Sequence, residues 1–202
     1  MIIRKGAEAE IRLEDWNERK VISKVRVRKG YRNTQLDERL RSQRIKTEVK
    51  LMTESRRLGI SIPIIFDVDL NGNKIVMEFV EGERVKDVLE SGYEDKSGLC
   101  RRIGEDVGKM HAKGIAHGDL TTSNILLKED RLYFIDFSLG EKSKEVEVLG
   151  VDLHLLREGF FSAHSQIFDL FDVVMKGYLA AYGEGSDVIQ KMEDIESRGR
   201  YT

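Results

Sequence analysis

The sequence predicts an α+β protein with two lobes: a β-rich N-terminal lobe that carries one long helix, and a truncated, mostly helical C-terminal lobe. Two observations support this prediction. Apolar residues alternate with charged ones in the first part of the chain, and they recur at helical spacing in the last part. The pattern changes at Glu81-Gly82, so we divide the 202 residues into an N-terminal lobe, 1–82, and a C-terminal lobe, 83–202.

The first elements are expected to be strands. Apolar and charged residues alternate from Ala7 to Leu13 and again from Val21 to Val27, which is typical of a half-buried sheet. Further along, residues 64–70 and 74–80 flank Asn71-Gly72-Asn73. The first two residues of that turn suit positive backbone dihedral angles, so we expect a tight β-hairpin there.

A long helix is expected between these two groups of strands. Thr34, followed three residues later by Asp37, has the pattern of a helix start, and Gly59 is a natural stop. The apolar positions between them recur at steps of three to five residues, and they are Leu36, Leu40, Ile45, Val49 and Met52. These positions are expected to form the inward face of the helix.

The rest of the chain is expected to form helices and one small hairpin. An apolar helix face that ends near Gly114 consists of Leu99, Ile103, Val107 and Met110. Two short strands over 124–127 and 132–137 then flank a turn over 128–130, and helices are expected over 151–161, 165–182 and 187–196.

Composition excludes several classes of protein. The 34 basic and 36 acidic residues give a formal net charge of −2, so nucleic acid could bind only at a local patch. The start of the chain lacks an apolar signal core, and no run approaches the roughly 18 apolar residues of a spanning helix, so we expect no membrane association. Cys100 is the only cysteine, which favours a reducing, cytoplasmic location.

The segment from His117 to Leu127 carries the most informative motif. It has the form H-x-D-x-x-x-x-N, with Asp119 and Asn124 as its polar members, and Asp136 follows at the end of the next expected strand. Phosphoryl transfer from a nucleotide needs a carboxylate that orients the attacking hydroxyl, together with amide and carboxylate oxygens that bind Mg²⁺. Each residue alone could have a purely structural role, such as capping a turn or ending a strand. Such unrelated roles would not reproduce the whole pattern with its spacing.

A site of this kind also needs a cation for the phosphates and a carboxylate that holds the cation. Lys24 is the candidate cation, because a period of two places it with Ile22 on one face of its strand; a solvated lysine is the alternative. Glu48 is the candidate partner, because it shares the apolar face of the long helix. The alternative is an exposed glutamate that pairs with Arg44.

Two features of ordinary protein kinases are missing. Gly6 is the only glycine in the first 29 residues, so no G-x-G-x-x-G loop covers the phosphates. The only proline is Pro63, so no A-P-E segment follows the metal-binding motif, and residues 137–202 leave little room for a large substrate lobe. Glu78 and Val80 lie where the second hairpin strand meets the lobe boundary, and we interpret them as the hinge that contacts an adenine ring.

Three further features have both structural and functional interpretations. Basic residues gather between Lys24 and Lys46, and they form either a solvated face or a contact for RNA phosphates or an acidic partner. The tail from Arg198 to Thr202 could reach an RNA, fold back toward the nucleotide or fray. His111, His154 and His164 lack the spacing of metal ligands, so no zinc site is expected.

These motifs resemble the small RIO-related atypical kinases that form the kinase subunit of the KEOPS complex. The resemblance covers the whole chain, and its specific parts are the Lys-Gly-Tyr-Arg element at 29–32 and the short C-terminal lobe. It implies a bilobal protein-kinase-like fold with ATP and Mg²⁺ in the cleft, weak serine/threonine phosphorylation, and ATPase activity within a complex that makes threonylcarbamoyl-adenosine in tRNA. The implied partners are the threonylcarbamoyl-transferase subunit, a small accessory subunit and, through the complex, tRNA.

Carried over position by position, the resemblance also implies a role for each candidate residue. Lys24 would bind the phosphates, and Glu48 would hold Lys24. Asp119 would act as the base or orient water, whereas Asn124 and Asp136 would bind Mg²⁺. Two other functions stay open: a small-molecule phosphotransferase of the aminoglycoside or choline type, and a non-catalytic scaffold that binds nucleotide.

Overall fold

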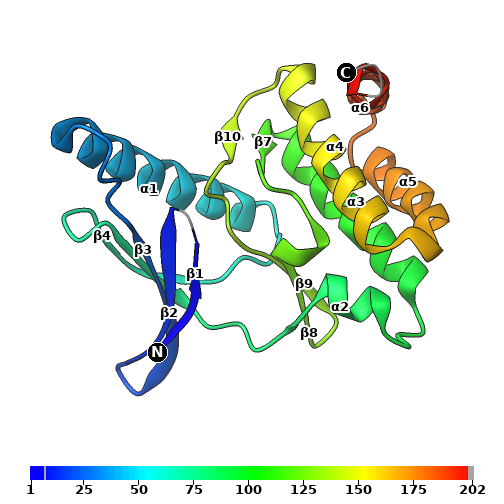
Figure 1. Cartoon of the computed structure of the whole chain (residues 1–202). Coiled ribbons are helices and arrows are strands. Elements are labelled where there is room, and N and C mark those ends of the chain that lie inside the picture. Colours follow the sequence, from blue (N-terminus) through cyan, green and yellow to red (C-terminus); the bar gives the residue numbers. More distant parts are fainter. Residues whose placement is uncertain (7, 200–202) are drawn as a thin grey trace.

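The chain folds into a β-rich N-terminal lobe and a mostly helical C-terminal lobe, as Figure 1 shows for a computed structural model that describes residues 1–6 and 8–199. The predicted α+β fold is confirmed. The N-terminal lobe is an antiparallel sheet of five strands in the order β1-β2-β3-β5-β4. Its strands are β1 (Ile2–Lys5), β2 (Ala9–Trp16), β3 (Arg19–Arg26), β4 (Ile65–Asp69) and β5 (Lys74–Glu78).

The register of this sheet places Lys24 in its middle. Lys24 lies on the central strand β3, opposite Ile11 of β2 on one side and Ile75 of β5 on the other. Directly opposed residues of antiparallel strands project to the same face, so Lys24 stands among apolar neighbours. The alternation that predicted this strand therefore also determines the direction of its one buried lysine.

The long helix α1 (Thr34–Arg57) differs from its prediction in its first turns. Asn33 is the N-cap, because its side chain accepts hydrogen bonds from the backbone N–H groups of Gln35 and Leu36. The first two predicted apolar positions, Leu36 among them, are exposed. The first buried apolar residue of the helix is Ile45. The helix ends as predicted, because Gly59 has a φ of 83° just beyond it.

The β4–β5 hairpin is confirmed, but the prediction for its turn is wrong. Among the loop residues it is Asn73 that takes a positive φ, of 52°, and Gly72 does not. The reason is the preceding Asp69, whose Oδ1 accepts hydrogen bonds from the backbone N–H groups of Asn71 and Gly72 at 3.0 and 2.9 Å. This side-chain cap stabilises a longer turn than the Asn-Gly pair alone would need.

The C-terminal lobe consists of helices around one small hairpin. Its elements are β6 (Glu83–Arg84), α2 (Val85–Glu90), α3 (Lys96–Ala112), β7 (Ile115–Ala116), η1 (Thr122–Asn124), β8 (Ile125–Lys128), β9 (Arg131–Phe134), β10 (Glu141–Lys142), α4 (Val146–Ala163), η2 (Ser165–Leu170), α5 (Phe171–Ala181) and α6 (Ser186–Gly199). The predicted hairpin is β8–β9. No helix in the described part of the chain is long and apolar enough to cross a membrane.

Two of the predicted helices differ from the structure. The sequence indicated a helix start after Gly150, but α4 begins at Val146. Gly150 lies inside the helix against α6, where an added Cβ would stand 2.6 Å from Lys191 Cγ, so close packing explains this glycine. The predicted helix over 165–182 is two elements, because the backbone at Ile167 leaves helical geometry with a φ of −127°.

Helices α3 and α5 approach closely enough that glycine is required between them. An added Cβ at Gly104 would lie 1.9 Å from the carbonyl oxygen of Val174, and one at Gly177 would lie 2.2 Å from that of Arg101. Both contacts are with backbone atoms, which cannot rotate away. The helices can therefore pack their apolar faces only because these positions lack side chains.

We expect Gly104→Ala to lower the free energy of unfolding by roughly 1–3 kcal/mol, because the added methyl group forces α3 and α5 apart. Chemical denaturation followed by circular dichroism measures the change. Gly92→Ala is the matched control, because nothing lies within 4 Å of an added Cβ there. Equal stability of the two variants would contradict the close approach.

Candidate active site

The loop that carries Asp119 is held from beneath by Asp152 of helix α4. Asp152 is 2% exposed, and its two carboxylate oxygens accept hydrogen bonds from the backbone N–H groups of His117 at 2.7 Å and Gly118 at 2.8 Å. His111 contacts the same carboxylate at 3.1 Å through Nε2. Gly118 has a φ of 81°, which suits glycine, so backbone and carboxylate together fix the approach to Asp119.

His117 supports the same loop through its ring. It packs 4.4 Å from the ring of Phe137, its Nε2 donates to the carbonyl oxygen of Ile135, and its Nδ1 accepts from the N–H of Asp119. Burial lowers the pKa of His117 despite the opposing effect of nearby carboxylates, first among them Asp152. A neutral imidazole has one donor and one acceptor, which matches these two contacts.

Asp119 and Asn124 are in direct contact. The amide nitrogen of Asn124 donates to the backbone oxygen and to Oδ2 of Asp119, both at 2.8 Å. The backbone oxygen of Asn124 in turn accepts from the N–H of Ile135, which joins this loop to the strand leading to Asp136. The β8–β9 hairpin therefore brings the three motif side chains to one end, as its short length led us to expect.

Asp136 is held in a strained but well-supported position. Its φ is 68°, and its Oδ1 accepts from Lys24 Nζ at 2.7 Å and from Ser138 Oγ at 2.5 Å. Burial by itself raises the pKa of Asp136, but the charge and hydrogen bond of Lys24, together with Ser138, outweigh it and lower that pKa to about 2. The carboxylate is therefore ionised at neutral pH and able to bind a cation.

Lys24 connects the two lobes at the floor of the cleft. It is 4% exposed, and its Nζ donates to Glu48 Oε1 at 2.5 Å as well as to Asp136 across the cleft. The other oxygen of Glu48 accepts from Arg26 at 2.7 Å. The expected pairing of Glu48 with Lys24 is present, whereas the alternative pairing with Arg44 is absent, because Arg44 contacts Glu8 instead.

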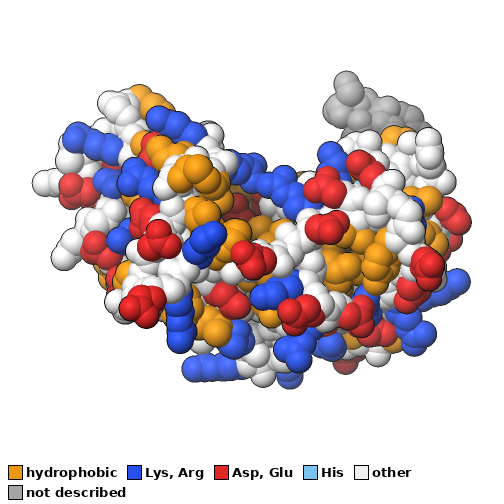
Figure 2. Space-filling view, turned by 90° about the horizontal axis from the view of Figure 1, so that it is seen from below, with side chains coloured by type: hydrophobic (Ala, Val, Ile, Leu, Met, Phe, Trp, Pro, Cys, Tyr) orange, Lys and Arg blue, Asp and Glu red, His pale blue; other side chains and the backbone are white. Residues whose placement is uncertain are grey.

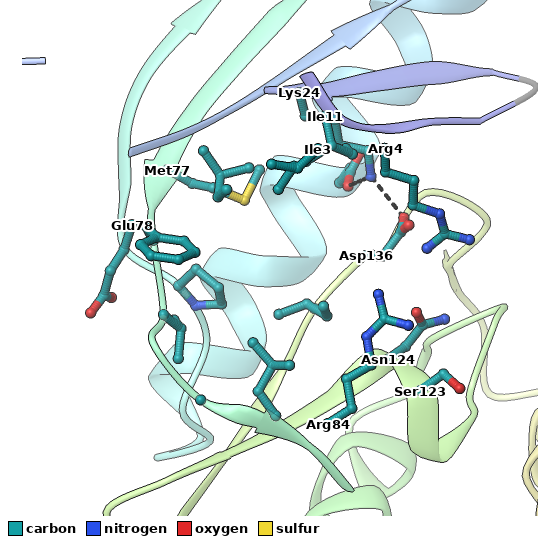
Figure 3. A pocket seen from close by; sticks show the side chains of 18 residues that line it. Ile3, Arg4, Ile11, Lys24, Met77, Glu78, Arg84, Ser123, Asn124 and Asp136 are labelled. Atoms are coloured by element: carbon teal, nitrogen blue, oxygen red, sulfur yellow. Dashed lines mark hydrogen bonds and ion pairs between the residues drawn. The ribbon is translucent and has the colours of Figure 1, made fainter. Parts of the chain in front are cut away.

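A cavity of about 370 Å³ lies between the lobes, and Lys24 and Asp136 are among the residues that line it. Its walls are largely apolar and include Ile3, Ile22, Met77, Val80, Leu126 and Ile135. Figure 3 shows that the side chain of Glu78 points away from this space, so Glu78 borders the cavity with its backbone. Asp119 does not line this cavity but an adjoining one, which it shares with Lys24 and Asp136.

The predicted basic stretch is only in part a surface feature. Lys24 and Arg26 are buried against Glu48, and Arg41 pairs with Asp37 at 2.7 Å. On the face shown in Figure 2, basic and acidic side chains are interspersed over both lobes. Part of the stretch therefore serves internal ion pairs. The RNA contact proposed for the tail falls largely on residues 200–202, which lie outside the described residues.

Three supporting residues escaped the sequence analysis. They are Asp152, Ser138 and Arg26, and none of them was among the predicted site residues. An acid within the apolar pattern of a helix was the available signal for Asp152. The described residues contain no group of three or more His, Cys, Asp or Glu side chains that could hold a metal on their own.

Comparison with known sequences identifies the family. Residues 11–165 match the RIO domain family. The chain is 42% identical over 210 residues to the KEOPS complex subunit Bud32 of Pyrococcus abyssi, and the alignment covers 99% of this chain and 96% of that protein. It is 44% identical over 197 residues to a probable bifunctional tRNA threonylcarbamoyladenosine biosynthesis protein of Methanosarcina barkeri; the alignment covers 97% of this chain but only 35% of that relative.

Solved structures share the fold. The Rio2 kinase of Chaetomium thermophilum, solved as an ADP/Mg²⁺-phosphoaspartate complex, aligns with a TM-score of 0.67 at 16% identity, over 98% of this chain and 70% of that one. WaaP in complex with acyl carrier protein aligns with a TM-score of 0.62 at 15% identity, over 98% and 87%. The sequence match and the nearly full-length relative together show that the chain belongs to the RIO domain family, in the group that includes the Bud32 subunit.

Proposed function

We propose that this chain is an ATP- and Mg²⁺-dependent atypical serine/threonine kinase that also hydrolyses ATP. The observation that carries the proposal is convergence: Lys24 from the sheet and Asp119, Asn124 and Asp136 from the hairpin region lie at one interlobe cleft. Carboxylate and amide oxygens are ligands that Mg²⁺ prefers, and an ammonium group binds phosphate, so the residues present fit a metal-bound triphosphate.

Each residue has a role that its contacts allow. Asn124 uses its amide nitrogen on Asp119, which leaves its amide oxygen for Mg²⁺, and Asp136 supplies a carboxylate. When bound, Mg²⁺ neutralises charge on the phosphates. Asp119 orients the attacking hydroxyl or water and accepts its proton. The terminal phosphoryl group moves to that oxygen, and its bond to the departing ADP breaks.

The remaining candidates position the nucleotide. Glu48 holds Lys24 in place for the phosphates, in keeping with the distance of 2.5 Å between Lys24 Nζ and Glu48 Oε1. Glu78 and Val80 present backbone groups to the adenine ring at the hinge, and Met77 provides an apolar contact for that ring. The Rio2 kinase with the same fold was solved with ADP and Mg²⁺, which supports this choice of ligands.

The relatives support a place in tRNA modification. One is a subunit of the KEOPS complex, and another is a probable tRNA threonylcarbamoyladenosine biosynthesis protein. We propose that this chain acts in the cytosol as the kinase subunit of such a complex. Its ATP turnover would support threonylcarbamoyl-adenosine formation together with the transferase subunit, a small accessory subunit and tRNA.

Mg²⁺-dependent ATP turnover tests the proposal. The wild type is measured alone and with the transferase subunit and tRNA, in parallel with Asp136→Asn, which lacks one carboxylate ligand. We expect weak autophosphorylation alone, faster hydrolysis with the partners, and loss of both in the variant. Equal turnover by the two proteins would contradict the assignment, and rapid phosphorylation of an aminoalcohol or sugar would favour a small-molecule phosphotransferase.

A further inference from the structure

The charges at the floor of the cleft compensate one another. Lys24 Nζ donates to Glu48 and Asp136, and its third donor contacts Ser138 at 2.6 Å, so all three donors of the ammonium group are engaged. Arg26 shares the carboxylate of Glu48. Two cations thus face two carboxylates. A nucleoside triphosphate brings several further negative charges; one bound Mg²⁺ would offset two of them, and the others need cations besides Lys24 and Arg26.

Two arginines reach the same cavity from opposite lobes. Arg4 lies on β1, and Arg84 lies at the end of β6, just before α2. Both line the cavity, and Figure 3 shows the guanidinium group of Arg84 pointing into it near Asn124, whereas the side chain of Arg4 passes beside Asp136 at its edge. Within residues 1–6 and 8–199, neither guanidinium has a hydrogen bond or an ion pair. Their charge is therefore not compensated by described side chains.

The β1–β2 connection is poorly suited to bind phosphates through its backbone. A glycine-rich loop presents several N–H groups to the phosphates, but this connection contains a single glycine, Gly6. The N–H of Gly6 already donates to the carbonyl oxygen of Ala9 at 2.9 Å. The N–H of Gly6 is therefore not free for a phosphate, and Arg4 is the cation that β1 places at the cavity.

We propose that Arg4 and Arg84 form a clamp that binds the polyphosphate chain of the nucleotide from both lobes. The clamp replaces a glycine-rich loop and makes the site selective for nucleoside triphosphates over nucleosides. It rests on the proposed function, because it assumes that the nucleotide occupies this cleft. Arginine suits the role because its planar group carries five donors, stays charged at all relevant pH values and binds phosphate oxygens in pairs.

The test compares nucleotides that differ only in their phosphates. The full chain is titrated calorimetrically with ATP and ADP in the presence of Mg²⁺, and with adenosine, for the wild type, Arg4→Ala, Arg84→Ala and the double variant. Arg39→Ala is the matched control, because it removes an exposed arginine of α1 outside the cavity. We expect each cleft substitution to weaken ATP binding by about tenfold or more, and the double variant to lose more still.

Adenosine binding should stay within about twofold of the wild type in every variant, because it has no phosphate for the clamp. An unchanged ATP affinity in the double variant would overturn the clamp and leave the proposed function intact. Equal losses for ATP and adenosine would overturn it too, since they would show a damaged pocket. If the wild type bound neither ATP nor adenosine, both the proposed function and the clamp would fail.

Discussion

Asp119→Asn is expected to lower the rate of ATP turnover by about 100-fold or more, while the affinity for Mg²⁺-ATP stays within about threefold. The carboxylate of Asp119 accepts a hydrogen bond from the amide nitrogen of Asn124, and an asparagine oxygen can accept the same bond. The loop therefore keeps its shape, but the group that orients the attacking oxygen and takes its proton is lost. Phosphate release and calorimetric titration measure the two quantities separately.

The matched control for this substitution is Asp130→Asn, which changes an exposed acid in the turn of the β8–β9 hairpin. Its turnover should equal that of the wild type. Turnover by Asp119→Asn at the rate of the control would remove Asp119 from the catalytic assignment. A parallel loss of ATP affinity would instead show that the substitution disturbs the binding site.

Asp152→Ala is expected to lower the free energy of unfolding by about 3–5 kcal/mol, which is roughly 10 °C in melting temperature for a chain of this size. The substitution leaves the buried N–H groups of His117 and Gly118 without their acceptor, and His111 loses its partner as well. Because the same groups hold the loop before Asp119, we expect ATP turnover to fall too. Urea denaturation measured at neutral pH gives the stability change.

The size of this effect should depend on pH. Burial by itself raises the pKa of Asp152, but the hydrogen bond and charge of His111, with smaller contributions from His117, outweigh it and lower that pKa. A carboxylate with a lowered pKa stabilises the folded protein above its unfolded pKa, near 3.8, and this contribution is lost as the pH falls through the folded value. The stability difference between wild type and variant should therefore shrink in acid.

Asp172→Ala is the control for Asp152→Ala, because it removes an exposed acid from the neighbouring helix α5. We expect it to change the free energy of unfolding by less than about 0.5 kcal/mol. If Asp152→Ala were as stable as this control, the carboxylate would not anchor the loop, and its contacts would be incidental.

The parts of this site that could be predicted from the sequence depend on local spacing. Asp119, Asn124 and Asp136 flank one short hairpin, so the chain between them leaves little freedom in where they meet. Lys24 and Glu48 are far apart in sequence, but each lies on an element whose periodicity defines an inward face. Two inward faces of one lobe meet in its core, which is why their contact could be expected.

The parts that could not be predicted depend on contacts between distant elements. Asp152 lies on a helix whose path beneath the loop is fixed only by packing in the C-terminal lobe. The helix start was predicted at residue 151 instead of 146, because sequence alone does not show that α6 passes close to Gly150. Arg4 and Arg84 belong to no recognisable sequence motif, and only the folded structure shows that both line one cavity.

A crystal structure of the chain with Mg²⁺ and a non-hydrolysable ATP analogue is the most direct test that this cleft is a site of phosphoryl transfer. We predict that the metal is bound by the Asn124 amide oxygen and the Asp136 carboxylate, with the phosphates at Lys24 and the adenine against the backbone of Glu78 and Val80. A nucleotide bound elsewhere, or a metal held by neither Asn124 nor Asp136, would contradict that assignment.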